Sequence, residues 1–188
     1  MQPWFATALS PMDPVFGHAA AAIVASVLAI AALEKLRQPE IFRDNVDNYQ
    51  ILPAVALPWV ARGLPLLELM AGLLLLPAAT RTAGAALACA HLLLVTLAVV
   101  VNLLRGRERI DCGCGGDLHT SLSSGLVLRN AVLVLLTFVA AAPTSARNPV
   151  WLDVAAVGCA TLFGLGLYYV VNLLLSQQSR LTDLRNSP

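Results

Sequence analysis

Residues 82–117 read TAGAALACAHLLLVTLAVVVNLLRGRERIDCGCGGD, which is an apolar run followed at once by a short polar loop. A helix needs about 20 consecutive apolar residues to cross a membrane, at a rise of about 1.5 Å per residue. The run at 82–104 therefore predicts a transmembrane helix, and the loop predicts where the chain leaves the hydrocarbon. Cys112 and Cys114 lie in this loop and are separated by a single glycine.

The composition extends this interpretation to the rest of the chain. Of the 188 residues, 58% are hydrophobic and only 12% are charged, whereas an ordinary soluble domain carries about 25% charged residues. The formal net charge of +1 argues against a nucleic-acid partner, because a phosphate backbone calls for a basic face. We therefore expect one integral membrane domain over residues 1–188, surrounded by the lipid bilayer.

Further apolar runs lie on both sides of residues 82–104. The predicted transmembrane helices cover about residues 15–36, 59–77, 82–104, 122–142 and 150–175. The second region is interrupted by Pro53, Pro58 and Pro65. Since proline breaks or kinks a helix interior, we expect four to five transmembrane helices. The predicted fold class is all-α, a polytopic membrane helix bundle.

A short amphipathic helix is predicted between the first two transmembrane helices. Its apolar residues recur at spacings near three and four: Ile41, Phe42, Val46 and Tyr49. Polar residues fill the positions between them, which is typical of a helix that lies on the membrane surface.

Basic residues predict which way the bundle faces. With five spans the connections alternate between two sides, and Arg62 and Arg129 are assigned to helix ends. One side then holds Lys35, Arg37, Arg43, Arg105, Arg107, Arg109, Arg180 and Arg185, and the other holds Arg81 and Arg147. The positive-inside rule places the first side in the cytoplasm. We expect the N-terminus outside and the loop with the two neighbouring cysteines in the cytoplasm.

Cys112 and Cys114 are the first candidates for chemistry. Cysteines one residue apart can close only a small strained ring, and strain raises the reduction potential of a disulfide. Three arginines in the same loop favour the thiolate over the thiol, which makes the sulfur more nucleophilic. We expect a redox-active dithiol. A metal site that adds His119 and Asp117 is an alternative, although the chain lacks a second spaced cysteine pair. Two inert loop cysteines are the other alternative.

Three further candidates lie inside predicted transmembrane helices. Glu68 is an intramembrane carboxylate and hence a functional hypothesis by default, weighed equally against a glutamate that only holds the bundle together. Cys89 and Cys159 lie about 10 and 14 Å from the outer ends of their helices, at a depth similar to that of Glu68 and His91. These two cysteines are candidates for a second thiol station, and packing as small apolar side chains is the alternative.

Motifs along nearly the whole chain resemble those of a known family. They are Glu34-Lys35-Leu36, Tyr49, Leu52-Pro53, Glu68 followed by Gly72 and a leucine run, and Asp111-Cys112-Gly113-Cys114-Gly115. Together they resemble the methylamine-utilisation membrane protein family MauE, which is related to the DoxX-like membrane proteins. The resemblance implies a multi-pass protein of the bacterial inner membrane. Within the family pattern, Cys112 and Cys114 would be the functional pair and Glu68 an intramembrane polar residue.

The same resemblance implies an accessory role. MauE-type proteins are associated with maturation of the small subunit of periplasmic methylamine dehydrogenase, which carries several disulfides, together with a thioredoxin-like periplasmic partner, MauD. Client disulfides form outside, whereas the basic residues place Cys112 and Cys114 inside. Both statements hold if reducing equivalents cross the membrane through Cys89 and Cys159.

Two other functions are compatible with the sequence. One is a non-redox membrane scaffold or chaperone. Another is a quinone-linked disulfide oxidase, which would need a cysteine pair on the outer side and a quinone pocket near it. The distribution of basic residues, which places Cys112 and Cys114 inside, disfavours this alternative. The sequence has no nucleotide-binding loop, hydrolase nucleophile elbow or zinc-protease helix motif, and we expect no cofactor and no metal.

Overall fold

The structure, a computed structural model, describes residues 12–107, 122–145, 147–148 and 150–186. These residues form six helices and no named strand. The helices are α1 (Pro14–Arg37), α2 (Pro39–Asn48), α3 (Leu57–Leu75), α4 (Arg81–Leu104), α5 (Ser124–Ala141) and α6 (Trp151–Asn186). The predicted all-α fold class is confirmed.

Five of these helices, all except α2, are long and apolar enough to cross a membrane. The short helix α2 follows α1 after a single residue, and its ten residues bury only Phe42. Pro58 lies in the first turn of α3, where its missing N–H is no loss. Pro65 lies inside α3 without ending it. The chain is therefore a polytopic helical membrane protein with an added amphipathic helix, as the sequence predicts.

The start and end of α1 follow from local chemistry. Asp13 caps the helix, because its carboxylate accepts a hydrogen bond of 2.9 Å from the Val15 backbone N–H, and Pro14 occupies the first helical position. Lys35 and Arg37 lie in the last turn, where cations complement the helix dipole. Pro39 cannot donate the hydrogen bond that would continue α1, so α2 starts in a new direction.

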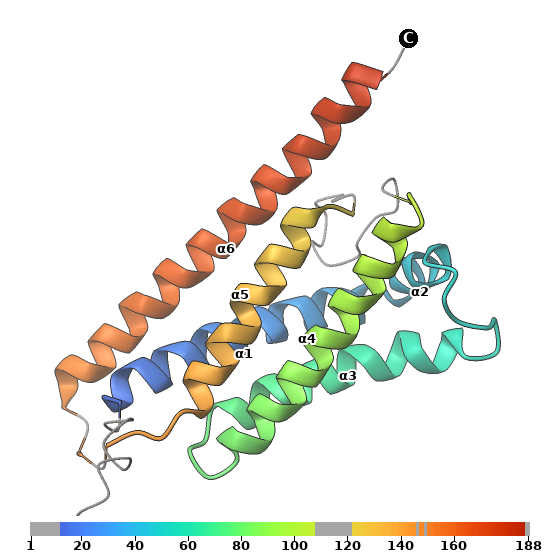
Figure 1. The fold of residues 1–188 in the computed structure, drawn as a ribbon. Coiled ribbons are helices and arrows are strands. Elements are labelled where there is room, and N and C mark those ends of the chain that lie inside the picture. Colours follow the sequence, from blue (N-terminus) through green and yellow to red (C-terminus); the bar gives the residue numbers. More distant parts are fainter. Residues whose placement is uncertain (1–11, 108–121, 146, 149, 187–188) are drawn as a thin grey trace, which may run out of the picture.

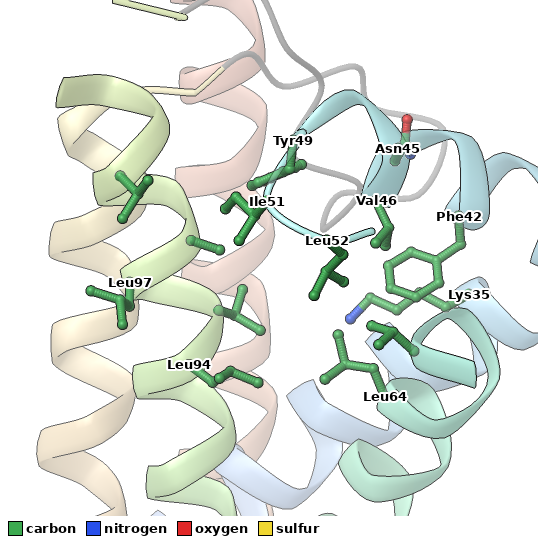
Figure 2. A pocket seen from close by; sticks show the side chains of 14 residues that line it. Lys35, Phe42, Asn45, Val46, Tyr49, Ile51, Leu52, Leu64, Leu94 and Leu97 are labelled. Carbon is green, nitrogen blue, oxygen red and sulfur yellow. The ribbon is translucent and has the colours of Figure 1, made fainter. Parts of the chain in front are cut away.

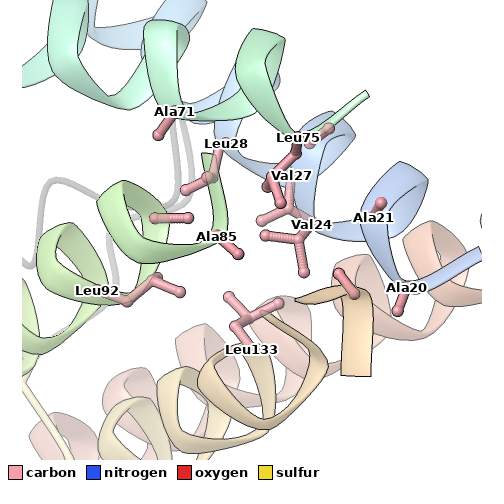
Figure 3. Packing of buried hydrophobic residues seen from close by; sticks show 13 residues of the cluster. Ala20, Ala21, Val24, Val27, Leu28, Ala71, Leu75, Ala85, Leu92 and Leu133 are labelled. Atoms are coloured by element: carbon pink, nitrogen blue, oxygen red, sulfur yellow. The ribbon is translucent and has the colours of Figure 1, made fainter. Parts of the chain in front are cut away.

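Helix α1 forms the centre of the bundle and packs against α3, α5 and α6, while α4 packs against α3 and α5 (Figure 1). The core is built on small residues of α1, such as Ala20, Ala21 and Ala25, with Val24 and Leu28 buried between them. Figure 3 shows Leu75, Ala85, Leu92 and Leu133 converging on this face of α1. Small residues let helix backbones approach closely, which favours helix association in lipid.

The two ends of the bundle differ. One end carries α2, the last turn of α4 and the first turn of α5, and α6 runs toward it (Figure 1). We call it the loop end, because Arg107 and Leu122 there flank residues 108–121. At the opposite end, Arg147 contacts Asp13 at 3.0 Å and Asp153 at 2.7 Å, joining α1 to α6. Arg147 donates hydrogen bonds to both carboxylate oxygens of Asp13. These bonds, together with the one from the Val15 N–H, hold the pKa of the Asp13 carboxyl below its usual value.

Candidate functional site

The predicted redox pair, Cys112 and Cys114, lies outside the described residues. The alternative metal ligands, Asp117 and His119, also lie outside them. The structure describes the residues on either side: α4 brings the chain to the loop end, and α5 starts from that same end (Figure 1). The redox assignment of the pair stays a prediction.

A cluster of three ionisable side chains is buried between α1, α3 and α4, and we call it the ionic cluster. Lys35 Nζ lies 2.5 Å from Glu68 Oε2, and His91 Nε2 lies 3.4 Å from Glu68 Oε1. The exposed fractions of these side chains are 7%, 4% and 2%, respectively. The carboxylate thus joins three helices through one side chain.

Helix packing explains why these groups meet. Gly72 follows Glu68 by one turn on the same face of α3, and a Cβ at Gly72 would lie 3.1 Å from the Ala25 carbonyl oxygen of α1. The absence of a side chain at Gly72 lets α1 and α3 approach closely. The motif of Glu68 followed by Gly72 therefore pairs a polar bridge with a close helix contact.

The ionic cluster is nearly balanced in charge. The Lys35 ammonium offsets the charge of the Glu68 carboxylate. His91 Nδ1 is buried without a hydrogen-bond partner among the described residues. The Lys35 ammonium also lies 5.5 Å from the centre of the Phe42 ring, within reach of a cation–π interaction.

A second buried polar group joins α4, α5 and α6. Arg129 donates hydrogen bonds to Asn172 Oδ1 at 2.5 Å and to Asn130 Oδ1 at 3.0 Å, and Asn130 Nδ2 donates to Thr96 Oγ1 at 3.0 Å. The guanidinium also lies 5.4 Å from the centre of the Tyr168 ring. Arg129 is near the start of α5, as predicted, but it is directed into the bundle and is only 9% exposed. Sequence reasoning assigned it only to a helix end.

The structure does not bring Cys89 and Cys159 together. Both thiols are free; Cys89 is half-buried on α4 and Cys159 is exposed on α6. Helix α4 packs against α3 and α5, whereas α6 packs chiefly against α1, and α5 lies between α4 and α6 in Figure 1. The relay through these cysteines stays a prediction.

The ionic cluster was predicted from the sequence only in part. His91 was expected at a similar depth in the membrane, and the structure places it against the carboxylate. Lys35 was missed, because it follows the first apolar run and was interpreted only as the end of that helix. A signal was present, since a carboxylate within the membrane usually pairs with a cation.

An apolar pocket of about 310 Å³ lies between α2, α3 and α4. Its walls include Phe42, Tyr49, Leu52, Leu64 and Leu94, and Figure 2 shows the Lys35 ammonium directed between Leu52 and Leu64. The pocket therefore has a nearly continuous apolar lining with one cationic group from the ionic cluster.

The connection between α2 and α3, which contributes to the pocket lining, forms hydrogen bonds with residues at the end of α4. Arg107 donates to the Gln50 side-chain oxygen at 2.5 Å, and Arg105 donates to the Gln50 backbone carbonyl at 3.4 Å. Gln50 has a positive φ of 48°, which is uncommon for a residue with a side chain. These contacts hold the α2–α3 connection against the residues that precede the cysteine pair in sequence.

The described residues thus define a polytopic helical membrane protein with an ion pair buried between its helices. The chain belongs to the MauE family, because the family model described as methylamine utilisation protein MauE matches residues 13–143.

Three relatives named methylamine utilization protein MauE illustrate the similarity. The chain is 34% identical to that of Methylophilus methylotrophus over 160 residues, or 84% of each chain. It is 39% identical to that of Paracoccus denitrificans over 150 residues, or 78% of this chain and 80% of the relative. It is 35% identical to that of Methylorubrum extorquens over 177 residues, or 89% and 91%. No solved structure matches the chain significantly.

Proposed function

We propose that this protein is an inner-membrane accessory factor of methylamine utilisation that serves disulfide formation in the small subunit of periplasmic methylamine dehydrogenase. Membership of the MauE family supports the role in methylamine utilisation. The observation that carries the thiol chemistry is the Cys112-Gly113-Cys114 sequence in the connection between α4 and α5. A thioredoxin-like protein of the MauD type is the proposed soluble partner.

The proposed reaction is a thiol–disulfide exchange. The attacking thiolate comes from the partner itself if the loop end faces the periplasm, and from the second station of Cys89 and Cys159 if the loop end faces the cytoplasm. It forms a mixed disulfide with the Cys112–Cys114 pair, and a second thiolate of the same donor then displaces it. The donor is left with a new disulfide, and the pair is left as two thiols. Each turnover transfers two electrons to the pair, which must be reoxidised before the next.

In this proposal Glu68 is a positioning residue. It bridges α1, α3 and α4 through Lys35 and His91, and α4 ends at the arginines that contact Gln50. The ionic cluster would therefore fix the position of α4, the helix that precedes the connection with Cys112 and Cys114. Cys89 and Cys159 are proposed as a second station only if the loop end faces the cytoplasm.

The test is the double substitution Cys112→Ser and Cys114→Ser in cells that depend on methylamine. We expect the dehydrogenase small subunit to accumulate with free thiols, detected by alkylation and a shift in gel mobility. Membrane levels of the accessory protein should stay unchanged. The variant Cys89→Ser with Cys159→Ser tests the second station separately: client disulfides should be lost if the loop end faces the cytoplasm and retained if it faces the periplasm. A non-redox scaffold would tolerate the first pair of substitutions, and normal client disulfides would therefore exclude the proposed chemistry.

A further inference from the structure

We propose that the pocket between α2, α3 and α4 binds a membrane quinone, with a ring carbonyl next to the Lys35 ammonium. This inference rests on the proposed function, because it identifies the chemical class that would reoxidise the cysteine pair. The pocket itself consists entirely of described residues.

The size and lining of the pocket suit a lipid-soluble ring. An apolar cavity of about 150 Å³ in another protein is large enough to bind benzene, and this pocket has about twice that volume, 310 Å³. Its lining is almost wholly apolar, from Val60 and Leu64 of α3 to Leu94 and Val101 of α4. A substituted ring with the first part of an apolar tail would fill this space, whereas a water-soluble metabolite would lose its hydration.

The charge balance of the pocket favours a neutral ligand with a hydrogen-bond acceptor. Lys35 contributes a cation to the lining, but the Glu68 carboxylate already offsets that charge at 2.5 Å. An anionic ligand such as a fatty acid would therefore compete with Glu68. A quinone carbonyl carries no net charge and can accept a hydrogen bond from an ammonium. Phe42, which contacts the ammonium, supplies an aromatic wall for the ring.

The pocket also lies in the half of the bundle that leads to the cysteine pair. Val101 of α4 lines it, and Arg105 and Arg107 beyond that residue hold Gln50, which lies between the lining residues Tyr49 and Ile51. Closing a disulfide from two thiols releases two electrons and two protons, and reduction of a quinone to a quinol consumes the same number. The electrons and protons of the proposed reoxidation therefore balance without another reactant.

The experiment measures binding of a benzoquinone with a decyl tail to the purified chain in lipid nanodiscs by titration calorimetry. The protein carries Cys112→Ser and Cys114→Ser, so that thiol chemistry cannot contribute to the heat. We expect Ala98→Trp to weaken binding about tenfold or more, because the indole ring would occupy the space between the pocket walls that the quinone ring needs. The control is Ala90→Trp, an exposed alanine on the same helix outside the lining, which should bind as before.

A second arm tests the polar contact. The paired substitution Lys35→Met with Glu68→Leu removes the donor without leaving a lone charge, and we expect it to weaken quinone binding. Decanol has the tail but no ring, and we expect it not to compete with the quinone for the unsubstituted pocket. Equal binding by the Ala98→Trp variant would overturn this pocket as the binding site. Displacement by decanol, or unchanged binding by the paired Lys35 and Glu68 variant, would overturn the quinone assignment in favour of a lipid chain. That result would not contradict the proposed cysteine chemistry, because alkylation of the client in the Cys112→Ser, Cys114→Ser variant tests that chemistry separately.

Discussion

The Glu68 carboxylate pairs with the Lys35 ammonium, which lies 33 residues earlier in the sequence, in the last turn of α1. Removing one member of a buried ion pair leaves an uncompensated charge, whereas replacing both with apolar groups of similar volume is often neutral. This asymmetry separates two roles for the ionic cluster. A purely structural pair can be replaced as a unit, but a pair that positions a reactive segment or a ligand cannot.

The substitution Glu68→Gln should lower the free energy of unfolding by about 3–5 kcal/mol, because it removes one charge of a buried ion pair. Thermal or denaturant unfolding in detergent measures this loss. The double variant Lys35→Met with Glu68→Leu should recover most of the stability. If that stable variant also supported normal client disulfides, the positioning role of Glu68 would be wrong and the cluster would be structural.

At the scale of helices, the turn between α3 and α4 is held by an unusually close backbone contact. A Cβ at Gly84 would lie 2.6 Å from backbone atoms of Leu74 and Leu75. Thr80 also donates a hydrogen bond of 2.8 Å to the Leu74 carbonyl, which satisfies one of the last carbonyls of α3. The start of α4, and with it the register of His91 against Glu68, depends on this contact.

The substitution Gly84→Ala should therefore destabilise the protein by about 1–3 kcal/mol or more, since the added methyl group meets backbone that cannot move aside. Gly63→Ala is the matched control, because no atom lies within 4 Å of a Cβ at that position of α3. Alanine is a better helix former than glycine by up to about 1 kcal/mol, so the control should be neutral or stabilising. Equal effects of the two substitutions on the unfolding midpoint would contradict the proposed close contact.

The elements could be predicted from the sequence because each transmembrane helix is a long apolar run with clear ends. The repeat of apolar residues also predicted α2. The prolines of the second region make its span the least certain to predict, but α3 continues through Pro65, since neighbouring helices and side chains in a membrane bundle can satisfy the backbone groups that a proline frees.

The contacts of the candidate site could not be predicted in the same way. Periodicity shows which side of a helix is apolar, but it does not show which helix lies opposite. Lys35 and Arg129 were assigned by their distance from helix ends, and both are buried because their side chains are directed into the bundle. Tertiary packing, rather than local sequence, decides that direction.

At the scale of the whole molecule, the alternation of five spans groups most of the basic residues at one end. In the structure, Lys35, Arg105 and Arg107 share the loop end with α2. The positive-inside rule predicts that this end faces the cytoplasm. In the proposed function, sidedness decides whether the cysteine pair acts on the periplasmic side directly or through a relay.

Labelling of intact cells with a membrane-impermeant maleimide measures this sidedness. In a chain with Cys89→Ser and Cys159→Ser, we expect Cys112 and Cys114 to react only after permeabilisation. The control is Ser145→Cys in a chain without other cysteines, since Ser145 lies in the α5–α6 connection at the opposite end and should react in intact cells. The reverse pattern would place the cysteine pair in the periplasm, where a thioredoxin-like partner could reach it without a relay.

Helix α6 continues past the segment that crosses the bilayer. The apolar part ends at Gln177, and the helix runs on to Asn186, a further length of about 14 Å at 1.5 Å per residue. A fluorescent reporter fused to the C-terminus would therefore stand clear of the lipid headgroups on a stiff spacer. Such a fusion would report the compartment of the C-terminus without crowding the neighbouring surface.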